Sequence, residues 1–380
     1  MDKRLERAWA EIDIDSIAYN IKEIRSFIKS ETLIMAVVKA NAYGHGVLKV
    51  AETLLANGAD RLAVATLDEA ILLRKHGFSV PLQVLSHTFE GRANEILDYN
   101  IIQTIYNMEL ANAISLEALK RRVKATIHIK VNTGMNRVGV SHDENGEKAI
   151  VQIYGMPGLV MEGIMTHFAS ADESNIDYTY RQFELFIDFC NRLERAGIRP
   201  PLRHVCNSAA VLRFPEMHLE MVRPGLLLYG LYPSADMEIS SVLLRPVMSL
   251  KACIININCI PEGAALSYGR THVTKRKSLI ATVPIGYGDG FPRRLSNNGK
   301  ILIGGEFAPI VGTICMDQCL ADITEIGDPV SVGDEVVLFG KQGRNEISVE
   351  EIAGKLGTIT YEVLCDIGMR IPRIYTKNKD

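Results

Sequence analysis

Residues 36–46 read AVVKANAYGHG, and the interpretation of the whole chain depends on this stretch. An apolar run, typical of a buried strand, ends at Lys39, and the loop-forming residues Asn41, Gly44 and Gly46 follow at once. A lone lysine at a strand end usually extends its side chain to solvent. Apolar surroundings instead disfavour the ammonium form and leave a nucleophilic amine, as in lysines that form Schiff bases. The neighbours of Lys39 therefore decide between these two roles.

The sequence around this stretch predicts repeated strand–helix units up to about residue 245. Short apolar runs alternate with amphipathic stretches of helical period. Eight such runs match a (β/α)8 barrel of the TIM type, an α/β fold, with a doubly wound open sheet as the alternative. The predicted strands are Leu33–Val38, Leu62–Ala65, Leu82–Leu85, Gln103–Tyr106, Thr126–Val131, Glu162–Met165, Arg203–Cys206 and Leu226–Leu231.

The pattern changes after Arg245 and Pro246. The remaining runs are short, rich in β-branched residues and separated by Gly, Pro or Asn, which predicts a mostly antiparallel β domain. One helix is expected after Ser348, where the Ser-x-x-Glu pattern of a capped helix start occurs. We therefore expect two domains, a barrel over residues 1–245 and a β domain over residues 246–380.

Composition narrows the classes of partner and compartment. The 380 residues carry 42 Lys and Arg against 45 Asp and Glu, a net charge of -3, which does not predict a nucleic-acid partner. The charged N-terminus lacks a signal-peptide core, and no apolar run approaches the length of a membrane span. Seven scattered cysteines are typical of reduced thiols in a cytoplasm and do not have metal-site spacing. We expect a cytoplasmic protein without a membrane anchor, nucleic acid or metal.

Other predicted strand ends carry groups that suit a functional Lys39. In a barrel, working side chains gather at the carboxyl ends of the strands. Serine, glycine amides and a helix start can hold a phosphate without a large net positive charge. One lysine, a phosphate cradle and several polar groups together indicate pyridoxal phosphate. The groups are Lys130, Arg137, His167, Asp172, Asn207, Ser208, Arg223 and Gly225.

The full set of motifs resembles that of the bacterial alanine racemase family over essentially the whole chain. The second domain contributes tyrosines beside glycines, which by composition alone are typical of turns and cores. In order, the motifs are AVVKANAYGHG, KVNTGMNRVG, THFASAD, NSAA, RPGLLLYG, SYGRT, PIGYGDG, CMDQ and YEVLCDI followed by RIPR.

The resemblance implies a pyridoxal 5′-phosphate enzyme that interconverts L- and D-alanine and works as a head-to-tail homodimer. Each active site would be completed by the C-terminal domain of the partner. Lys39 would hold the cofactor covalently and act as one base, and Tyr268 of the partner subunit would act as the second base on the opposite face of the substrate. A phenol must lose its proton to serve as a base, and His167 with Arg223 would promote that loss.

The resemblance assigns the remaining site residues position by position. Arg223 would face the pyridine nitrogen, and because a guanidinium cannot lend its proton, the cofactor would be a weaker electron sink, which favours racemisation over transamination. Lys130 matches a lysine that can be carbamylated, with a plain ion pair as the other interpretation. Phosphate contacts would come from Tyr43, Asn207, Ser208, Gly225, Leu226 and Tyr361; substrate-carboxylate contacts from Arg137 and Met316; and the gate from Ser170, Asp172, His204, Tyr287 and Arg293.

Two positions depart from the family pattern. Thr313 stands where the outer gate commonly carries arginine, and Gly288 stands where alanine is usual. We expect an altered entrance with the chemistry intact.

Three other functions compete with alanine racemisation. A decarboxylase that shares the barrel and β domain would need a glycine-triplet phosphate loop and an acid at the position of Arg223, and the sequence has neither. A barrel that only binds the cofactor would lack a second domain and any equivalent of Tyr268. A racemase of serine, lysine or other amino acids stays open, because one methylene changes discrimination by only about 1–3 kcal/mol. The absence of a signal peptide favours alanine over large side chains.

Overall fold

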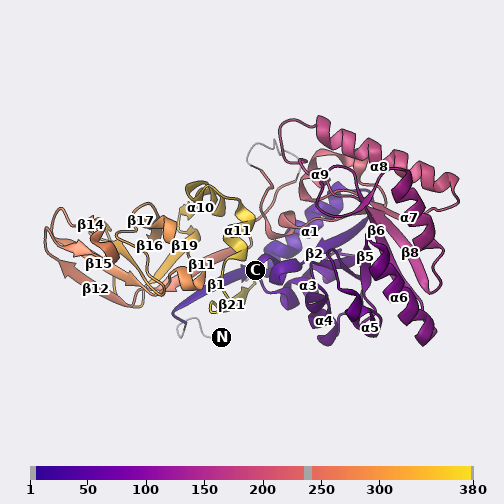
Figure 1. Cartoon of the computed structure of the whole chain (residues 1–380). Coiled ribbons are helices and arrows are strands. Elements are labelled where there is room, and N and C mark those ends of the chain that lie inside the picture. The colour runs from indigo at the N-terminus through magenta and orange to yellow at the C-terminus, as the bar shows by residue number, and fades with distance from the viewer. Residues whose placement is uncertain (1–5, 235–241, 378–380) are drawn as a thin grey trace. The chain divides into compact units, whose positions relative to one another are not determined.

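The computed structural model describes residues 6–234 and 242–377, which form two compact units (Figure 1). One unit comprises Ser16–Ala42 and Val47–Pro246. The other comprises the chain up to Asp15, the segment Tyr43–Gly46 and the chain from Val247 onward.

The first unit is a parallel barrel whose strands are buried along almost their whole length. Its eight main strands pair in parallel in the order β10-β2-β3-β4-β5-β6-β8-β9, and the short β7 (Val140–Ser141) pairs with β6. Continuous apolar runs suit such strands, because both faces of a parallel sheet are covered. The strands are β2 (Leu33–Val37), β3 (Arg61–Val64), β4 (Leu82–Val84), β5 (Ile102–Ile105), β6 (Ala125–Asn132), β8 (Leu159–Met165), β9 (Leu202–His204) and β10 (Met221–Val222).

Helices follow the strands and surround them (Figure 1). Residues next to a helix start can determine where it begins, as in α4, where Thr66 and Glu69 form a reciprocal capping box. Their ends use glycine, as at Gly77 and Gly197, whose φ angles of 86° and 81° suit a residue without a side chain. The helices of this unit are α1 (Ile14–Phe27), α2 (Lys39–Tyr43), α3 (Val47–Ala56), α4 (Leu67–Lys75), α5 (Ala93–Asp98), α6 (Met108–Arg121), α7 (Glu144–Tyr154), α8 (Asp177–Arg195) and α9 (Ser208–Arg213).

The predicted eighth strand at Leu226–Leu231 is wrong. Residues Leu226–Tyr229 form a buried 3-10 helix, η4, and the strand that pairs with β2 is the two-residue β10 just before it. The backbone amide of Arg223 donates to the carbonyl of Cys206 at 3.0 Å, which joins this edge to the segment after β9. The barrel is therefore closed earlier in the chain than the apolar run LLLYG suggested, and Arg223 follows the last strand.

The second unit is built mostly from antiparallel strands, as the sequence predicted. Its largest sheet has the order β17-β16-β19-β11-β1-β21, with β20 beside β19, and only β1 and β21 pair in parallel among its described ladders. Two smaller sheets are β12-β15-β18 and β13-β14. The strands are β11 (Met248–Cys253), β12 (Asn256–Ile260), β13 (Ala265–Leu266), β14 (His272–Val273), β15 (Ser278–Val283), β16 (Lys300–Ile303), β17 (Glu306–Pro309), β18 (Cys319–Asp322), β19 (Glu335–Gln342), β20 (Asn345–Ile347) and β21 (Arg373–Thr376).

The two described α-helices of this unit are α10 (Val349–Leu356) and α11 (Thr360–Cys365). The side chain of Ser348 accepts the amide of Glu351 at 3.1 Å, so the predicted capped helix start is present.

The N-terminal strand β1 (Ala8–Asp13) belongs to the second unit, whereas the expected division placed residues 1–245 together. β1 pairs with β11 from Ala8 to Ile12 and with β21 from Ala10 to Asp13. Both partners are more than 230 residues away along the chain. Local periodicity carries no information about such a distant pairing. The observed pairing corrects the N-terminal boundary that was expected for the barrel.

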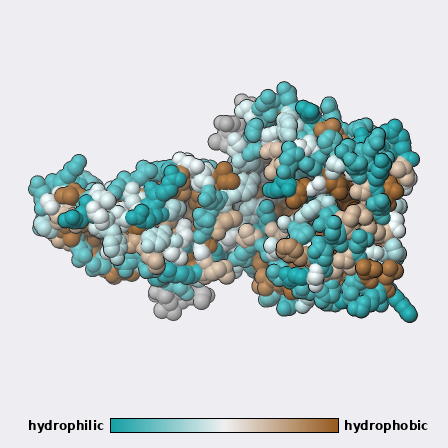
Figure 2. Space-filling model, in the orientation of Figure 1, coloured by the Kyte–Doolittle hydropathy of each residue, from teal (hydrophilic) through white to brown (hydrophobic). Residues whose placement is uncertain are grey.

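Hydrophilic side chains predominate on the face that Figure 2 shows, and the hydrophobic ones lie in separate small groups. Within residues 6–234 and 242–377, no helix is both long and apolar enough to cross a membrane.

Candidate active site

Lys39 lies directly after β2, at the carboxyl edge of the barrel. The ladder continues one residue beyond β2, because the amide of Val38 donates to the carbonyl of Ala63 at 2.8 Å. Lys39 then opens α2, whose next residues turn in the left-handed sense. The φ angles are 52° for Ala40, 54° for Asn41 and 55° for Ala42. Left-handed backbone costs about 1–2 kcal/mol for each residue with a side chain, so strain is concentrated beside the lysine.

Arg223 is buried in the barrel and surrounded by acceptors. Its guanidinium donates to Nδ1 of His204 at 2.9 Å and to the carbonyls of His204, Thr166 and Val205 at 2.7, 2.9 and 3.0 Å. A weaker contact of 3.4 Å joins it to Nδ1 of His167. Burial lowers the pKa of Arg223 to about 10, so the group keeps its charge near neutral pH. Its position after β10 places it at the same barrel edge as Lys39.

His204 was expected at the gate, but it lies fully buried inside the barrel as a partner of Arg223. Its Nε2 lies 2.8 Å from Nδ1 of His128, and Nε2 of His128 lies 2.9 Å from Oε2 of Glu162. Arg61 binds both oxygens of Glu162 at 2.6 and 3.0 Å. The gate assignment is therefore corrected, because both ring nitrogens of His204 are engaged within the barrel.

The protons along the hydrogen bonds from Arg223 to Glu162 have one consistent arrangement. A guanidinium only donates, so His204 accepts at Nδ1 and carries its proton on Nε2, and His128 accepts at Nδ1 and donates from Nε2 to Glu162. Burial lowers the pKa of both imidazoles, which favours the neutral rings that this arrangement needs. Burial opposes ionisation of Glu162, but hydrogen bonds from His128 and Arg61 outweigh it and lower the pKa to about 2.

Cations gather at the barrel edge. Lys130, in β6, is almost fully buried, and burial together with Arg137, Arg223 and Lys39 lowers its pKa to about 8. Burial and the same cations hold the pKa of His167 well below its usual value. A set of mutually repelling cations around a neutral imidazole is an arrangement that bound anions would stabilise.

The expected phosphate cradle joins the starts of α9 and η4. Asn207 caps α9 by accepting the amide of Ala210 at 3.1 Å. The hydroxyl of Ser208 accepts the amide of Gly225 at 2.9 Å, so it fixes the turn that leads into Leu226. The Gly225 amide is thus already engaged within the chain, while Asn207 acts as a helix cap.

Tyr43 and Tyr361 lie together in the second unit. Their ring centroids are 5.9 Å apart, and the rings are tilted by 47°. Burial raises the pKa of Tyr43 above its ordinary range, so the phenol keeps its proton and can donate a hydrogen bond. Gly44 makes this packing possible: its φ is 83°, and a Cβ there would lie 2.3 Å from the carbonyl oxygen of Leu364.

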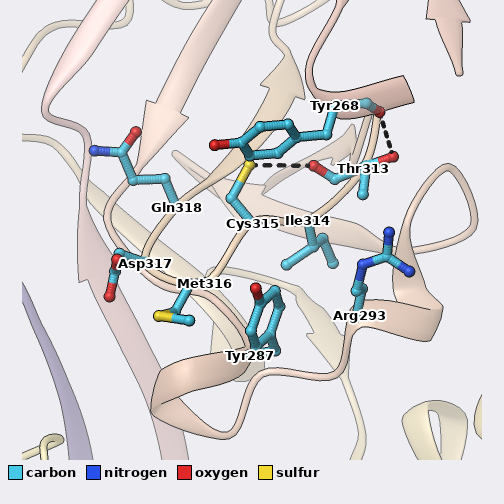
Figure 3. A pocket seen from close by; sticks show the side chains of 9 residues that line it. All are labelled: Tyr268, Tyr287, Arg293, Thr313, Ile314, Cys315, Met316, Asp317 and Gln318. Carbon is cyan, nitrogen blue, oxygen red and sulfur yellow. Dashed lines mark hydrogen bonds between the residues drawn. The ribbon is translucent and has the colours of Figure 1, made fainter. Parts of the chain in front are cut away.

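A separate pocket in the second unit presents Tyr268 (Figure 3). Its volume is about 650 Å³. Tyr268 is 73% exposed and begins a short 3-10 helix, η5 (Tyr268–Arg270). The pocket is lined by Tyr268, Tyr287, Arg293, Thr313, Ile314, Cys315, Met316, Asp317 and Gln318.

Thr313 holds the turn that carries Tyr268. Its hydroxyl donates to the carbonyl of Tyr268 at 2.8 Å, and the hydroxyl of Ser267 donates to the carbonyl of Thr313 at 2.5 Å. Ser267 and Arg270 have φ angles of 60° and 50°, so the turn is strained on both sides of the tyrosine. The residue that departs from the family pattern therefore contacts the turn of the expected second base.

The other departure, Gly288, lies against Met316. Its amide donates to the carbonyl of Met316 at 2.8 Å, and a Cβ would lie 2.7 Å from Nη1 of Arg370 and 3.1 Å from the Met316 oxygen. Arg370 binds Asp317 at 2.7 Å. The missing side chain makes room for this ion pair beside the pocket.

The remaining gate residues have different settings. Ser170 is buried, and its hydroxyl has no hydrogen-bond partner among the described residues, whereas Asp172 is half-buried. Tyr287 and Arg293 line the pocket of the second unit. In the described part of the chain, no three His, Cys, Asp or Glu side chains gather as a metal site would require.

Sequence reasoning missed Arg61, Glu69, His128 and Glu162. His128 and Glu162 each interrupt an apolar strand, in ATIHIKVN and LVMEGIM, and a polar side chain in a buried strand indicates a bonded partner. Glu69 carried a weaker signal, because its role as a helix cap already explains it.

Comparisons with known proteins give the same family over both units. Residues 12–233 match the family model described as alanine racemase, N-terminal domain, and residues 247–375 match that of the C-terminal domain. An alanine racemase of Clostridium tetani is 47% identical over 379 residues, covering 100% of this chain and 97% of that protein. One of Methanococcus maripaludis is 48% identical over 367 residues, covering 97% and 98%.

Solved structures agree. An alanine racemase of Clostridium difficile 630 superposes with a TM-score of 0.94 at 40% identity, covering 98% of this chain and 96% of that one. The enzyme of Bacillus anthracis with bound L-Ala-P superposes with a TM-score of 0.93 at 37% identity, with the same coverage.

Proposed function

Because this chain belongs to the alanine racemase family, we propose that it interconverts L- and D-alanine with two bases, Lys39 and Tyr268 of the partner subunit. One base removes the proton from the α-carbon, and the other returns a proton from the opposite face, which inverts the configuration. The enzyme is accordingly an amino-acid racemase, and the cofactor of its family is pyridoxal 5′-phosphate.

The barrel edge fits this cofactor by its charge and by its amine. Lys39 offers the amine that binds an aldehyde carbon. The cations Arg137 and Arg223 favour the two anions that the reaction brings in, a phosphate and a substrate carboxylate. When bound, pyridoxal phosphate supplies the electron sink that makes the α-proton removable.

Arg223 sets the reaction type. Its acceptors hold the guanidinium in place, and its pKa of about 10 keeps it a cation that donates hydrogen bonds without giving up a proton. A pyridine nitrogen facing it would stay unprotonated, which weakens the electron sink and favours return of the proton to the α-carbon. Neutral His167, beside Arg223, would connect this charge to the phenol of the second base.

The other residues position the reactants. Tyr43, Ser208, Leu226 and Tyr361 would hold the phosphate. Gly225 would fix the turn before Leu226 through its bond to Ser208, and Asn207 would fix the start of α9. Arg137 and the amide of Met316 would bind the substrate carboxylate, and Ser170, Asp172, Tyr287 and Arg293 would line the entrance.

The observation that carries the proposal is the exposed phenol of Tyr268 on a strained turn. Packing does not account for a side chain that is 73% exposed, and strained turns recur at functional sites. A second copy of the chain would cover this tyrosine and use it. We propose a cytoplasmic homodimer in which the barrel domain binds the cofactor and the β domain completes the site of the partner. Its product D-alanine would be used for peptidoglycan.

Serine is the second candidate substrate. A pocket bounded by Tyr361 and Met316 would admit a methyl group, and an apolar wall would reject an added hydroxyl only weakly. The altered positions Thr313 and Gly288 lie in or beside the pocket of Tyr268, where they could change access.

The test is proton exchange at the α-carbon. The purified protein is incubated with pyridoxal phosphate and single L-amino acids in D₂O; loss of the α-proton is followed by NMR and product chirality by chromatography. We expect exchange and D-product to be greatest with alanine and absent in Lys39→Ala. If exchange is greatest with serine or lysine, that amino acid is the substrate in place of alanine. If no exchange occurs although the cofactor is bound, the proposed function is contradicted.

A further inference from the structure

The strained turn after Lys39 requires anchors from outside itself. Left-handed φ angles extend from Ala40 to Tyr43 without a glycine among them, and such a conformation persists only where the surroundings hold it. Within the turn, the amide of Ala42 donates to the carbonyl of Val38 at 2.9 Å, and Oδ1 of Asn41 accepts the amide of Val47 at 2.9 Å. These bonds hold the end of the turn.

Glu69 holds the start of the turn. Its Oε1 accepts the amide of Ala40 at 2.6 Å, while its Oε2 accepts the amides of Ala65 and Thr66 at 2.8 and 3.1 Å. One carboxylate thus bridges the segment after β2 and the segment after β3. The same residue closes the capping box of α4, which in turn fixes the carboxylate.

We propose that Glu69 is a positioning residue for Lys39, acting by clamping the Ala40 amide so that the lysine leaves the strand in one direction. The role deepens the proposed function and rests on it, since Lys39 is there the residue that binds the cofactor and moves a proton. A carboxylate is required because both of its oxygens face N–H donors. An amide in its place would turn an NH₂ group toward at least one of them.

The chain offers two matched controls. Asp68 is the adjacent carboxylate in the first turn of α4, but it binds Arg92 at 2.8 and 3.1 Å and its side chain is 76% exposed. Asp68→Asn therefore makes the same charge change at the same helix start without touching the turn. Thr66→Ala removes the hydroxyl that accepts the Glu69 amide, so it loosens the capping box while leaving the carboxylate in place.

The experiment compares Glu69→Gln with both controls in the full-length protein. Hydrogen exchange of the amides of residues 40–43 is measured by mass spectrometry without cofactor, and pyridoxal phosphate affinity is measured from its absorbance. We expect Glu69→Gln to speed exchange and weaken cofactor binding by about tenfold or more, since a hydrogen bond to a charged group is lost. The value of kcat should fall more than KM changes, and Asp68→Asn should match the unaltered protein.

Two outcomes overturn the proposal. One is a Glu69→Gln protein whose exchange and affinity equal those of Asp68→Asn. The other is an equal increase in exchange in Thr66→Ala, which would attribute the effect to fraying of α4. The exchange readout does not depend on turnover, so a chain that fails to racemise any amino acid but shows the Glu69 effect would refute the proposed function and leave the clamp standing.

Discussion

The surroundings of Lys130 destabilise the charged form of its side chain. It is buried in a strand, and burial and three neighbouring cations lower its pKa from 10.5 to about 8. A carbamate would replace this cation by an anion, because the neutral amine adds carbon dioxide and releases a proton. The product could pair with Arg137, which the ammonium repels.

We therefore predict that Lys130 is carbamylated, with a pH dependence that follows its pKa. Only the neutral amine reacts, so the carbamate should increase as the pH rises through about 8, well below the 10.5 of an ordinary lysine. The measurement is a ¹³C NMR titration with labelled carbon dioxide held at constant dissolved concentration. Lys130→Arg is the control, and an undiminished carbamate signal in that variant would assign the modification to another amine.

At the scale of elements, the barrel interior carries a hydrogen-bonded chain from Arg223 through His204 and His128 to Glu162. Arg223 donates to His204, His204 to His128 and His128 to Glu162, so the guanidinium at one end sets the direction of donation throughout. The strands β6, β8 and β9 are thus joined by side chains as well as by their ladders.

We predict that His128 and His204 both carry their proton on Nε2 and are neutral at pH 7. ¹⁵N NMR of histidine-labelled protein measures this, because the two neutral tautomers and the imidazolium have different shifts. The lowered pKa of each ring means that the imidazolium appears only below the usual 6.5. An imidazolium signal from His204 at pH 7 would contradict the assignment.

The same prediction extends to stability. Glu162→Leu leaves the His128 N–H and Arg61 without their acceptor, so we expect a loss of about 2–4 kcal/mol in the free energy of unfolding by urea. Glu162→Gln keeps an acceptor oxygen for His128, and its loss should be smaller.

Elements whose signal is local were predictable. Seven of the barrel strands and the capped helix α10 follow from apolar runs, periodicity and the Ser-x-x-Glu pattern. β10 was not, because a two-residue strand is too short for a periodic signal and the apolar run LLLYG after it satisfies burial as a 3-10 helix. β1 joins strands far along the chain, and the local pattern carries no information on such partners.

The site residues also divide into those that the sequence pattern predicted and those that it did not. Lys39 and the charged strand ends followed from the barrel rule, whereas Tyr268 came from the motif resemblance, since a tyrosine beside a glycine is typical of a turn. The misplacement of His204 has a physical cause: position at a strand end does not distinguish a side chain that points into the barrel from one that points to the entrance. Burial decides this, and burial is a property of the folded chain.

At the scale of the whole molecule, the proposed site needs two chains, because the second base, Tyr268, is assigned to the partner subunit. Lys39→Ala and Tyr268→Ala proteins should each be inactive alone. In a mixed dimer, the intact barrel of one chain meets the intact β unit of the other, and the second site carries both defects.

We predict that mixing these two inactive proteins restores activity. With equal amounts and random exchange, half of the dimers are mixed and each has one working site of two, so about a quarter of the unaltered activity should return. The measurement is D-alanine formation after dissociation and reassociation, with mixed dimers counted by native mass spectrometry using a tag on one chain. The control is each variant carried alone through the same treatment. Mixed dimers without activity would place both bases in one chain, because a site within one chain would then be broken in every subunit.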